Sequence, residues 1–219
     1  MFAPSLVIFD CDGVLIDSEH LASIAETRVF RRYGLDMADD FIVNHCVGLN
    51  WASGLAVVEK HFQWTAPPEF VAMAEEETHR VFETELKAIT GIAELLDCLP
   101  MPRCVASSSA PDRLRRTLSL VGLHDRLAPH IFSATMVANG KPAPDLFLYA
   151  AHEMGYEPGS SLVIEDSVAG VTAAKAAGMQ VIGFTGGSHA KPDLGPRLTA
   201  LGADAIAADM QKVAIILGV

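Results

Sequence analysis

Short runs of apolar residues recur along the chain and predict the strands of a buried sheet. Residues 6–9 are the first example, since four apolar residues follow one another there without a polar interruption. Runs that do not alternate between apolar and polar positions are typical of strands covered on both faces. The other runs are residues 104–106, 162–164 and 181–184, with weaker ones at 131–133 and 205–207.

Helical patterns separate these runs from residue 92 onward. One helix is predicted between Pro111 and Gly122, because proline favours the first turn of a helix and glycine its end. Two more are predicted over residues 146–155 and 167–177, the second ended by Gly178. Strands and helices that alternate with short links predict an α/β fold with a doubly wound, mainly parallel sheet.

The segment between the first two strong strands differs from the rest because its pattern is almost entirely helical. It is too long to be a single crossover connection. We therefore predict an inserted helical cap domain over residues 16–86. Residues 1–15 would supply the first strand and the loop after it, and residues 87–219 the remainder of the α/β core, with hinges near residues 14–17 and 87–91.

Composition narrows the classes of function. The chain has 219 residues, 50% of them hydrophobic, and a net charge of −11. Because no stretch gathers Lys and Arg into a stripe, we expect no binding to nucleic acid or to a membrane. The first residues lack a basic region and the apolar run after them is too short for a signal peptide, which predicts a cytoplasmic protein. The four cysteines lack paired spacing and are expected to be free, mostly buried thiols. The oligomeric state stays open.

Polar side chains gather where the predicted strands end, which is the edge at which open α/β sheets bind ligands. They are Asp10 and Asp12 after the first strand, Ser107, Ser108 and Ser109 after the second, Lys141 in a loop, and Glu165 and Asp166 after residues 162–164. Carboxylates about 4 Å apart repel by about 4 kcal/mol per pair at an effective dielectric of about 20, more than one lysine offsets. Oxygen ligands of this kind suit Mg²⁺, so the sequence predicts a magnesium site.

A metal beside carboxylates, a lysine and hydroxyls is the equipment for phosphoryl transfer. Asp10 can attack phosphorus and form an aspartyl phosphate. Asp12, two residues on, can protonate the leaving oxygen and later take the proton of the attacking water. Lys141 and Ser107 can bind the phosphate oxygens. Gly13 fits a sharp turn that lets the ligand approach closely.

Four segments, in order, resemble the motifs of the haloacid dehalogenase superfamily. They are Asp-Cys-Asp-Gly-Val-Leu at 10–15, Val-Ala-Ser at 105–107, Gly-Lys-Pro at 140–142 and Glu-Asp-Ser-Val-Ala-Gly at 165–170. The predicted helical insertion resembles the C1-type cap of that superfamily. The resemblance implies a Rossmann-like core and a Mg²⁺-dependent phosphatase in which Asp10 is the nucleophile and Asp12 the general acid and base.

The resemblance also implies how the site binds its ligands. Mg²⁺ would be bound by the Asp10 carboxylate, the Asp12 main-chain carbonyl and Asp166, with Glu165 as a further ligand or a neighbour of the ligands. The phosphate would be bound by Ser107, Ser108 and Lys141.

Within the superfamily, the chain resembles the β-phosphoglucomutases and related sugar-phosphate phosphatases. The mutase pattern has a His, an Arg and a Lys at positions that correspond here to Ala22, about Trp51, and Ala110. All three are missing, so we expect hydrolysis of a small phosphorylated metabolite, either a sugar phosphate or a phosphosugar acid. A mutase-type isomerase is the first alternative. A receiver-like phosphoacceptor module is the second, although such a module has no large helical insertion after its first strand.

Some of these residues have simpler interpretations. Ser109 can cap the helix that follows it, and Glu165 and Asp166 can cap the helix near Ser167. Cys11 is expected to point away from the two aspartates, because successive residues that leave a strand face opposite sides. The residues of the insertion that are candidates for contact with the leaving group are Asn44, His45, Asn50, Trp51 and Ser53.

Overall fold

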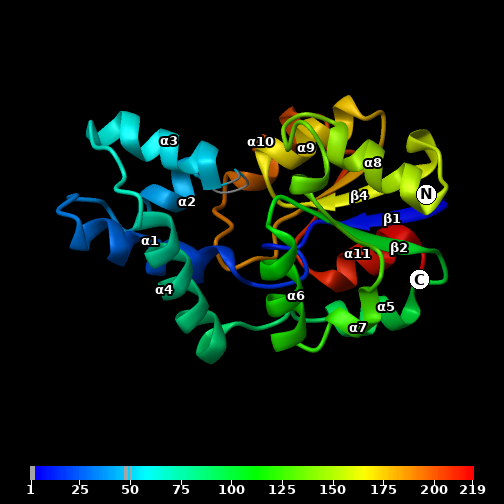
Figure 1. Cartoon of the computed structure of the whole chain (residues 1–219). Helices are drawn as coiled ribbons and strands as arrows, with labels where there is room; N and C mark the ends of the chain where they lie inside the picture. The colour runs from blue at the N-terminus through cyan, green and yellow to red at the C-terminus, as the bar shows by residue number, and fades with distance from the viewer. Residues whose placement is uncertain (1–2, 47–48, 50) are drawn as a thin grey trace.

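The computed structural model describes residues 3–46, 49 and 51–219. In these ranges the chain forms a sheet of six parallel strands in the order β3-β2-β1-β4-β5-β6 (Figure 1). The strands are β1 (Leu6–Phe9), β2 (Arg103–Ser107), β3 (Ile131–Ser133), β4 (Ser161–Glu165), β5 (Gln180–Phe184) and β6 (Ala205–Ala207). The prediction of a doubly wound parallel α/β sheet is confirmed.

The strand order determines where a ligand can bind. β1 pairs with β2 through Ile8 opposite Cys104, and with β4 through Ile8 opposite Val163. The chain moves outward from β1 to β3 on one side and from β4 to β6 on the other, so the order reverses between β1 and β4. The carboxyl ends of two such strands border the crevice that binds ligands in open α/β sheets. The residues that follow β1 and those that end β4 therefore face the same crevice.

Helices cover both faces of the sheet. One face packs against α5 (Ile92–Cys98), α6 (Pro111–Leu120), α7 (His124–Leu127) and α11 (Met210–Leu217). The other packs against α8 (Asp145–Met154), α9 (Val168–Ala176) and α10 (Leu194–Ala200). Two short 3-10 helices, η1 (Ala134–Met136) and η2 (Pro158–Ser160), lie in the connections. Because both faces are covered, successive residues of β1 are all buried, which explains its unbroken apolar run.

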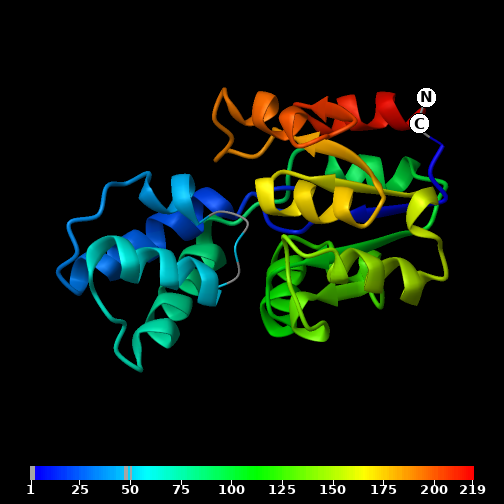
Figure 2. The same ribbon diagram turned by 90° about the horizontal axis from the view of Figure 1, so that it is seen from above.

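The helical insertion follows β1 and forms a separate lobe. Its helices are α1 (Glu19–Arg32), α2 (Phe41–His45), α3 (Trp51–Phe62) and α4 (Phe70–Glu85). Figure 2 shows this lobe beside one end of the sheet and joined to it by the chain segments before α1 and after α4. The lobe has an apolar core of its own, in which Phe30, Phe41, Val58 and Phe70 are buried. The predicted helical insertion is confirmed.

The two connecting segments run side by side. Ile16 and Ala88 form an antiparallel bridge, and the Asp17 amide donates to the Lys87 carbonyl at 2.9 Å. These contacts fall within the segments expected to be hinges. The division into residues 1–15, 16–86 and 87–219 as domains stays a prediction.

The predicted strands differ from the observed ones mainly at their ends. Residues 6–9, 131–133 and 205–207 match β1, β3 and β6 residue for residue. Ser107 and Glu165 are expected after their strands but are the last residues of β2 and β4. Parallel pairing continues to them, since Ser107 lies opposite Ser133 and Glu165 opposite Gly183.

Two further expectations concern the cysteines and the membrane. All four cysteines are free; Cys11 and Cys104 are buried, but Cys46 is half-buried and Cys98 exposed, so the expectation of mostly buried thiols is wrong for these two. Cys11 packs in the apolar core on one face of the sheet, away from the aspartates, as expected. Within the described ranges, each helix is too short or too polar to cross a bilayer.

Candidate active site

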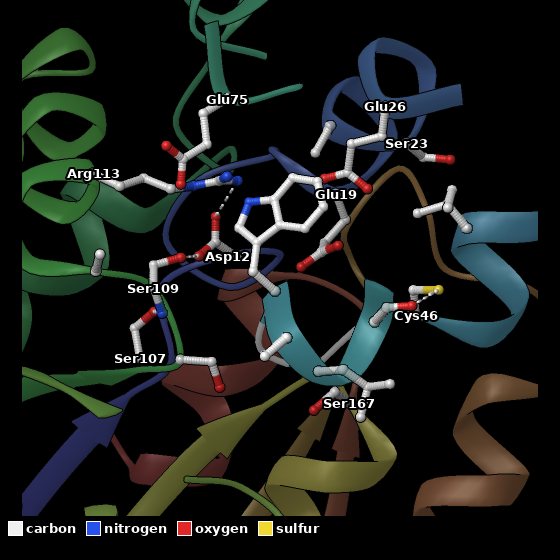
Figure 3. Close-up of a pocket in the computed structure, with 18 of the residues that line it drawn as sticks. Asp12, Glu19, Ser23, Glu26, Cys46, Glu75, Ser107, Ser109, Arg113 and Ser167 are labelled. Carbon is white, nitrogen blue, oxygen red and sulfur yellow. Dashed lines mark hydrogen bonds and ion pairs between the residues drawn. The ribbon is translucent and has the colours of Figure 1, made fainter. Parts of the chain in front are cut away.

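A cavity of about 590 Å³ lies between the carboxyl edge of the sheet and the helical insertion. Asp10 after β1, Ser107 of β2 and Glu165 of β4 line its floor. Its walls come from α1, α2, α3 and α4 of the insertion and from α6 of the core. Figure 3 shows the side chains of Asp12 and Glu19 directed into this space. The polar residues that the sequence places at the strand ends therefore border one cavity.

Lys141 joins two buried carboxylates on the floor of the cavity. Its Nζ donates to Asp10 Oδ1 at 2.6 Å and to Glu165 Oε1 at 2.7 Å. Burial raises the pKa of Asp10 well above its ordinary value; Lys141 opposes this, and the charges of Glu165 and Asp166 add to it. Burial lowers the pKa of Lys141, but the two carboxylates outweigh that effect and raise it, so the ammonium form is kept.

The second oxygen of Glu165 is bound by the start of α9. Glu165 Oε2 accepts a hydrogen bond from the Ser167 amide at 2.7 Å. The N-cap of α9 is Ser167 itself, whose Oγ accepts from the Gly170 amide at 3.0 Å. The capping interpretation is therefore partly correct, because Glu165 satisfies one amide near the helix start while Ser167 provides the cap.

Asp166 keeps one oxygen without a hydrogen bond. Its Oδ2 is buried and unpartnered among the described residues, although His189 Nε2 lies 3.1 Å away. Burial raises the pKa of Asp166, the charge of Glu165 adds to this, and Lys141 lowers it. His189 is itself buried, in the loop after β5. No pattern in the sequence indicates a role for His189, because the histidines are scattered and this loop has the composition of a plain turn.

Two glycines let backbone and carboxylates approach closely. Gly13 has a φ of +80°, and a Cβ on it would lie 1.8 Å from Asp166 Oδ2. A Cβ on Gly170 would lie 1.6 Å from Glu165 Oε1. No other residue type fits at either position unless the carboxylate moves. The turn expected at Gly13 is confirmed.

Asp12 is held by hydroxyl groups from two sides. Ser18 Oγ donates to its Oδ1 and Ser109 Oγ to its Oδ2, each at 2.7 Å, and Arg113 Nη2 lies 3.9 Å from Oδ1. The interpretation of Ser109 as a helix cap is wrong. Ala110, in extended backbone, is the N-cap residue of α6, and no side chain caps it.

The two other serines of this strand end also border the cavity. Ser107 is buried, and its Oγ accepts a hydrogen bond from the Ser109 amide at 3.1 Å. Ser108 is half-buried and lines the cavity. Phosphate binding by Ser107, Ser108 and Lys141 stays a prediction.

The acidic cluster has the chemistry of a cation site. Asp10, Glu165 and Asp166 each offer an oxygen that lies within 4.8 Å of those of the other two. The available ligand atoms are all carboxylate oxygens, and within the described residues Asp166 Oδ2 makes no hydrogen bond, although His189 Nε2 lies 3.1 Å from it. Hard divalent cations prefer such oxygen ligands. The residues present therefore fit a metal such as Mg²⁺.

The insertion contributes other residues than expected. Of its candidates for contact with the leaving group, Trp51 lines the cavity, whereas Asn44, His45 and Ser53 are not among the lining residues. Asn50 lies outside the described residues. The side chains that sequence reasoning missed are Glu19, Glu26, Glu75 and His79 of the insertion and Arg113 and Arg116 of α6.

The positions compared with the mutase pattern do face the cavity. Ala22, Trp51 and Ala110 all line it. The imidazole, guanidinium and amine of that pattern are therefore missing from places that a ligand can reach.

Comparisons with known proteins agree with this geometry. A family model described as haloacid dehalogenase-like hydrolase matches residues 7–184. Phosphorylated carbohydrates phosphatase from Thermotoga maritima is 35% identical over 184 residues, covering 80% of this chain and 82% of its own. 6-Phosphogluconate phosphatase from Escherichia coli is 29% identical over 194 residues, covering 88% of each chain. The crystal structure of a conserved haloacid dehalogenase-like protein of unknown function from Agrobacterium tumefaciens superposes with a TM-score of 0.86 at 38% identity, over 99% of this chain and 98% of that one.

Proposed function

The chain belongs to the haloacid dehalogenase-like hydrolase family, and we propose that it is a Mg²⁺-dependent phosphatase of a small phosphorylated metabolite, either a sugar phosphate or a phosphosugar acid. The observation that carries the proposal is the buried cluster of Asp10, Glu165 and Asp166 around Lys141, at the floor of a cavity large enough for such a substrate. The names of the two curated relatives, both phosphatases, support this class of reaction.

In this proposal Mg²⁺ is held by the carboxylates of Asp10 and Asp166 and by the main-chain carbonyl of Asp12. Both oxygens of Glu165 are engaged by Lys141 and by the Ser167 amide, which favours Glu165 as a neighbour that orients the site over Glu165 as a direct ligand. When bound, the metal supplies positive charge that neutralises the phosphate oxygens.

The phosphate group is proposed to bind between Lys141 and the serines at the end of β2. The Lys141 ammonium faces the nucleophile Asp10 directly. Because Ser107 Oγ accepts from the Ser109 amide, its own hydrogen is available for a phosphate oxygen. Ser108, which lines the cavity, would donate to a second one.

The reaction then takes two steps. In the first, an Asp10 oxygen attacks phosphorus, the bond from phosphorus to the leaving oxygen breaks, and protonated Asp12 gives its proton to that oxygen. In the second, a water gives a proton to Asp12 and attacks the aspartyl phosphate, which releases inorganic phosphate and regenerates Asp10. Ser18 and Ser109 keep Asp12 in position for both transfers.

The helical insertion is proposed to act as a cap. Residues of α1, α2, α3 and α4, including Trp51, line the cavity, so closure of the insertion would exclude water while Asp10 attacks. The paired segments at Ile16 and Ala88 would be the hinge.

The two alternative functions are less well supported. A mutase-type isomerase needs side chains that Ala22, Trp51 and Ala110 do not supply at the cavity. A receiver-like module has no counterpart of the insertion α1 to α4.

A phosphate-release screen tests the proposal. The purified protein is assayed with sugar phosphates, phosphosugar acids and phosphoglycolate, in Mg²⁺ and in EDTA, and sugar 1-phosphates are also scored for isomer formation. We expect phosphate release that requires Mg²⁺. Release that persists in EDTA, an isomer in place of phosphate, or no release across the panel would contradict it.

A further inference from the structure

One acidic side chain of the cavity has a position that the phosphoryl transfer does not use. Glu26 lies on α1, four residues after Ala22 and four before Phe30, and all three line the cavity because this spacing keeps them on one helix face. Figure 3 shows Glu26 extending from α1 toward the space that Glu19 also faces. It therefore borders the part of the cavity next to the insertion, where the leaving group of a bound phosphate ester would lie.

We propose that Glu26 determines specificity by accepting hydrogen bonds from donor groups of the leaving group, so that the enzyme selects phosphate esters of hydroxyl- or ammonium-bearing metabolites over those of sugar acids. This inference rests on the proposed phosphatase function and makes its substrate class narrower.

The basic side chains around the cavity already have other partners. Lys141 binds Asp10 and Glu165. Arg113 lies 3.9 Å from Asp12, with its guanidinium over the ring of Phe82.

Arg116, the other arginine that lines the cavity, is bound by an imidazole that does not neutralise its charge. Arg116 Nη1 lies 3.0 Å from His79 Nδ1, which joins α6 to α4 across the cavity. Among the described residues, Glu26 makes neither a hydrogen bond nor an ion pair, so no side chain neutralises it directly.

Apolar side chains make up much of the cavity lining near Glu26. Phe30, Ile42 and Val58 line the same cavity. Burial raises the pKa of the Cys46 thiol and the charge of Glu26 adds to this, which places Cys46 close by. Burial raises the pKa of Glu26 to about 7, and the charge of Arg113 offsets this only in part.

A leaving group that enters this space displaces the water around Glu26. A buried acceptor that loses its solvent and gains no donor is costly, which makes a site of this kind reject ligands that lack the donor. A hydroxyl or an ammonium group supplies the donor. A carboxylate in its place supplies none and, above about pH 7 where Glu26 is ionised, adds a second negative charge. The chemistry around Glu26 thus differs from what the carboxylate of a phosphosugar acid requires.

Matched substrates test the inference. Sorbitol 6-phosphate and 6-phosphogluconate share an open six-carbon chain, but the first ends in a hydroxymethyl group and the second in a carboxylate. In a second pair, glucose 6-phosphate has a hydroxyl group where glucosamine 6-phosphate has an ammonium group. For the wild type, we expect kcat/KM to be at least about tenfold higher for sorbitol 6-phosphate than for 6-phosphogluconate. In Glu26→Gln this ratio should fall by about tenfold or more, because the neutral amide no longer repels the acid. The second pair shows whether hydroxyl or ammonium is the preferred donor.

Three controls separate the possible failures. Glu85→Gln, at the exposed end of α4, should keep the wild-type ratio, and a melting temperature of Glu26→Gln near that of the wild type shows that it folds. p-Nitrophenyl phosphate, whose leaving group has no sugar hydroxyls, reports the phosphatase reaction alone. The inference fails while the phosphatase proposal stands if p-nitrophenyl phosphate is hydrolysed in Mg²⁺ but the wild type does not prefer sorbitol 6-phosphate, or turns it over too slowly to measure. It also fails if the ratio of kcat/KM for sorbitol 6-phosphate to that for 6-phosphogluconate is the same in Glu26→Gln as in the wild type. If no substrate releases phosphate, both fail.

Discussion

Replacing Lys141 by methionine removes the cation that binds two buried carboxylates. Methionine keeps much of the length and the apolar stem of the lysine side chain, so the change acts mainly on charge. In the wild type, Nζ lies 2.6 Å from Asp10 Oδ1 and 2.7 Å from Glu165 Oε1, and all three side chains are buried. In Lys141→Met, Asp10 and Glu165 lose the ammonium group that binds them, and Asp166 loses a nearby positive charge.

The size of the effect follows from this geometry. Removing one partner of a buried ion pair costs about 3–5 kcal/mol. The carboxylate oxygens of the cluster lie within 4.8 Å of one another, and two unit charges at about that separation repel by about 3.5 kcal/mol at an effective dielectric of about 20. For a chain of this length, about 3–5 kcal/mol lowers the melting temperature by about 6–20 °C.

The direction of the pH effect is also fixed. Burial raises the pKa of Asp10 and of Asp166 in the folded state. A carboxyl group whose pKa is higher in the folded than in the unfolded state stabilises the folded state when it is protonated, at low pH. This contribution to the free energy of unfolding is lost as the pH rises through the folded-state pKa. Loss of Lys141 raises the pKa of Asp10 further, so the deficit of the variant should be largest at pH 7 and smaller at pH 5.

Thermal unfolding in EDTA at pH 7 and pH 5 measures both effects. Lys175→Met is the matched control, because Lys175 pairs with Asp204 on the surface and such pairs contribute about 0–1 kcal/mol. The claim that Lys141 stabilises the buried carboxylates would be refuted by a Lys141→Met protein that melts like the wild type at pH 7. It would also be refuted if the loss in melting temperature were larger at pH 5 than at pH 7.

The remaining variants act on the groups around the carboxylates. Gly170→Ala puts a methyl group where Glu165 Oε1 lies, so we expect phosphate release to fall by at least about hundredfold, with a lower melting temperature; wild-type turnover would show that this close approach is unimportant. Ser109→Ala removes one of the two hydroxyls on Asp12, so steady-state kinetics should show kcat about tenfold lower with little change in KM. A change in KM alone would place Ser109 in substrate binding.

The sheet could be predicted because burial on both faces leaves an unbroken apolar run at each strong strand. The carboxyl ends of β2 and β4 could not be predicted to the residue. Ser107 and Glu165 are polar, so the apolar pattern stops before them, but main-chain pairing with β3 and β5 continues through them. Strand ends of this kind depend on backbone hydrogen bonds that any side chain allows.

The convergence of Asp10, Asp12, Lys141 and the acids after β4 could be predicted because carboxyl ends of parallel strands share one edge. His189 could not, since it reaches Asp166 through an irregular loop whose path no periodic pattern specifies. From the sequence, Ser109 could either cap the helix or belong to the site. The helix begins at Pro111 with Ala110 as its N-cap residue, so Ser109 lies one residue too early to be the cap and instead binds Asp12.

The cavity wall from the insertion was the least predictable part. Glu26 carries no motif, and its helix has charged residues on more than one side. Only the packing of α1 against α4 shows which of these charged residues line the cavity.

Turnover of Asp10→Asn tests the central claim, which is attack on phosphorus by this carboxylate. The amide keeps the size of the side chain and removes its nucleophilic charge. With saturating Mg²⁺ and the best substrate of the screen, we predict that phosphate release falls by at least about thousandfold while the variant remains folded. Release within about tenfold of the wild-type rate would contradict the account, because the aspartyl phosphate could not then be the intermediate.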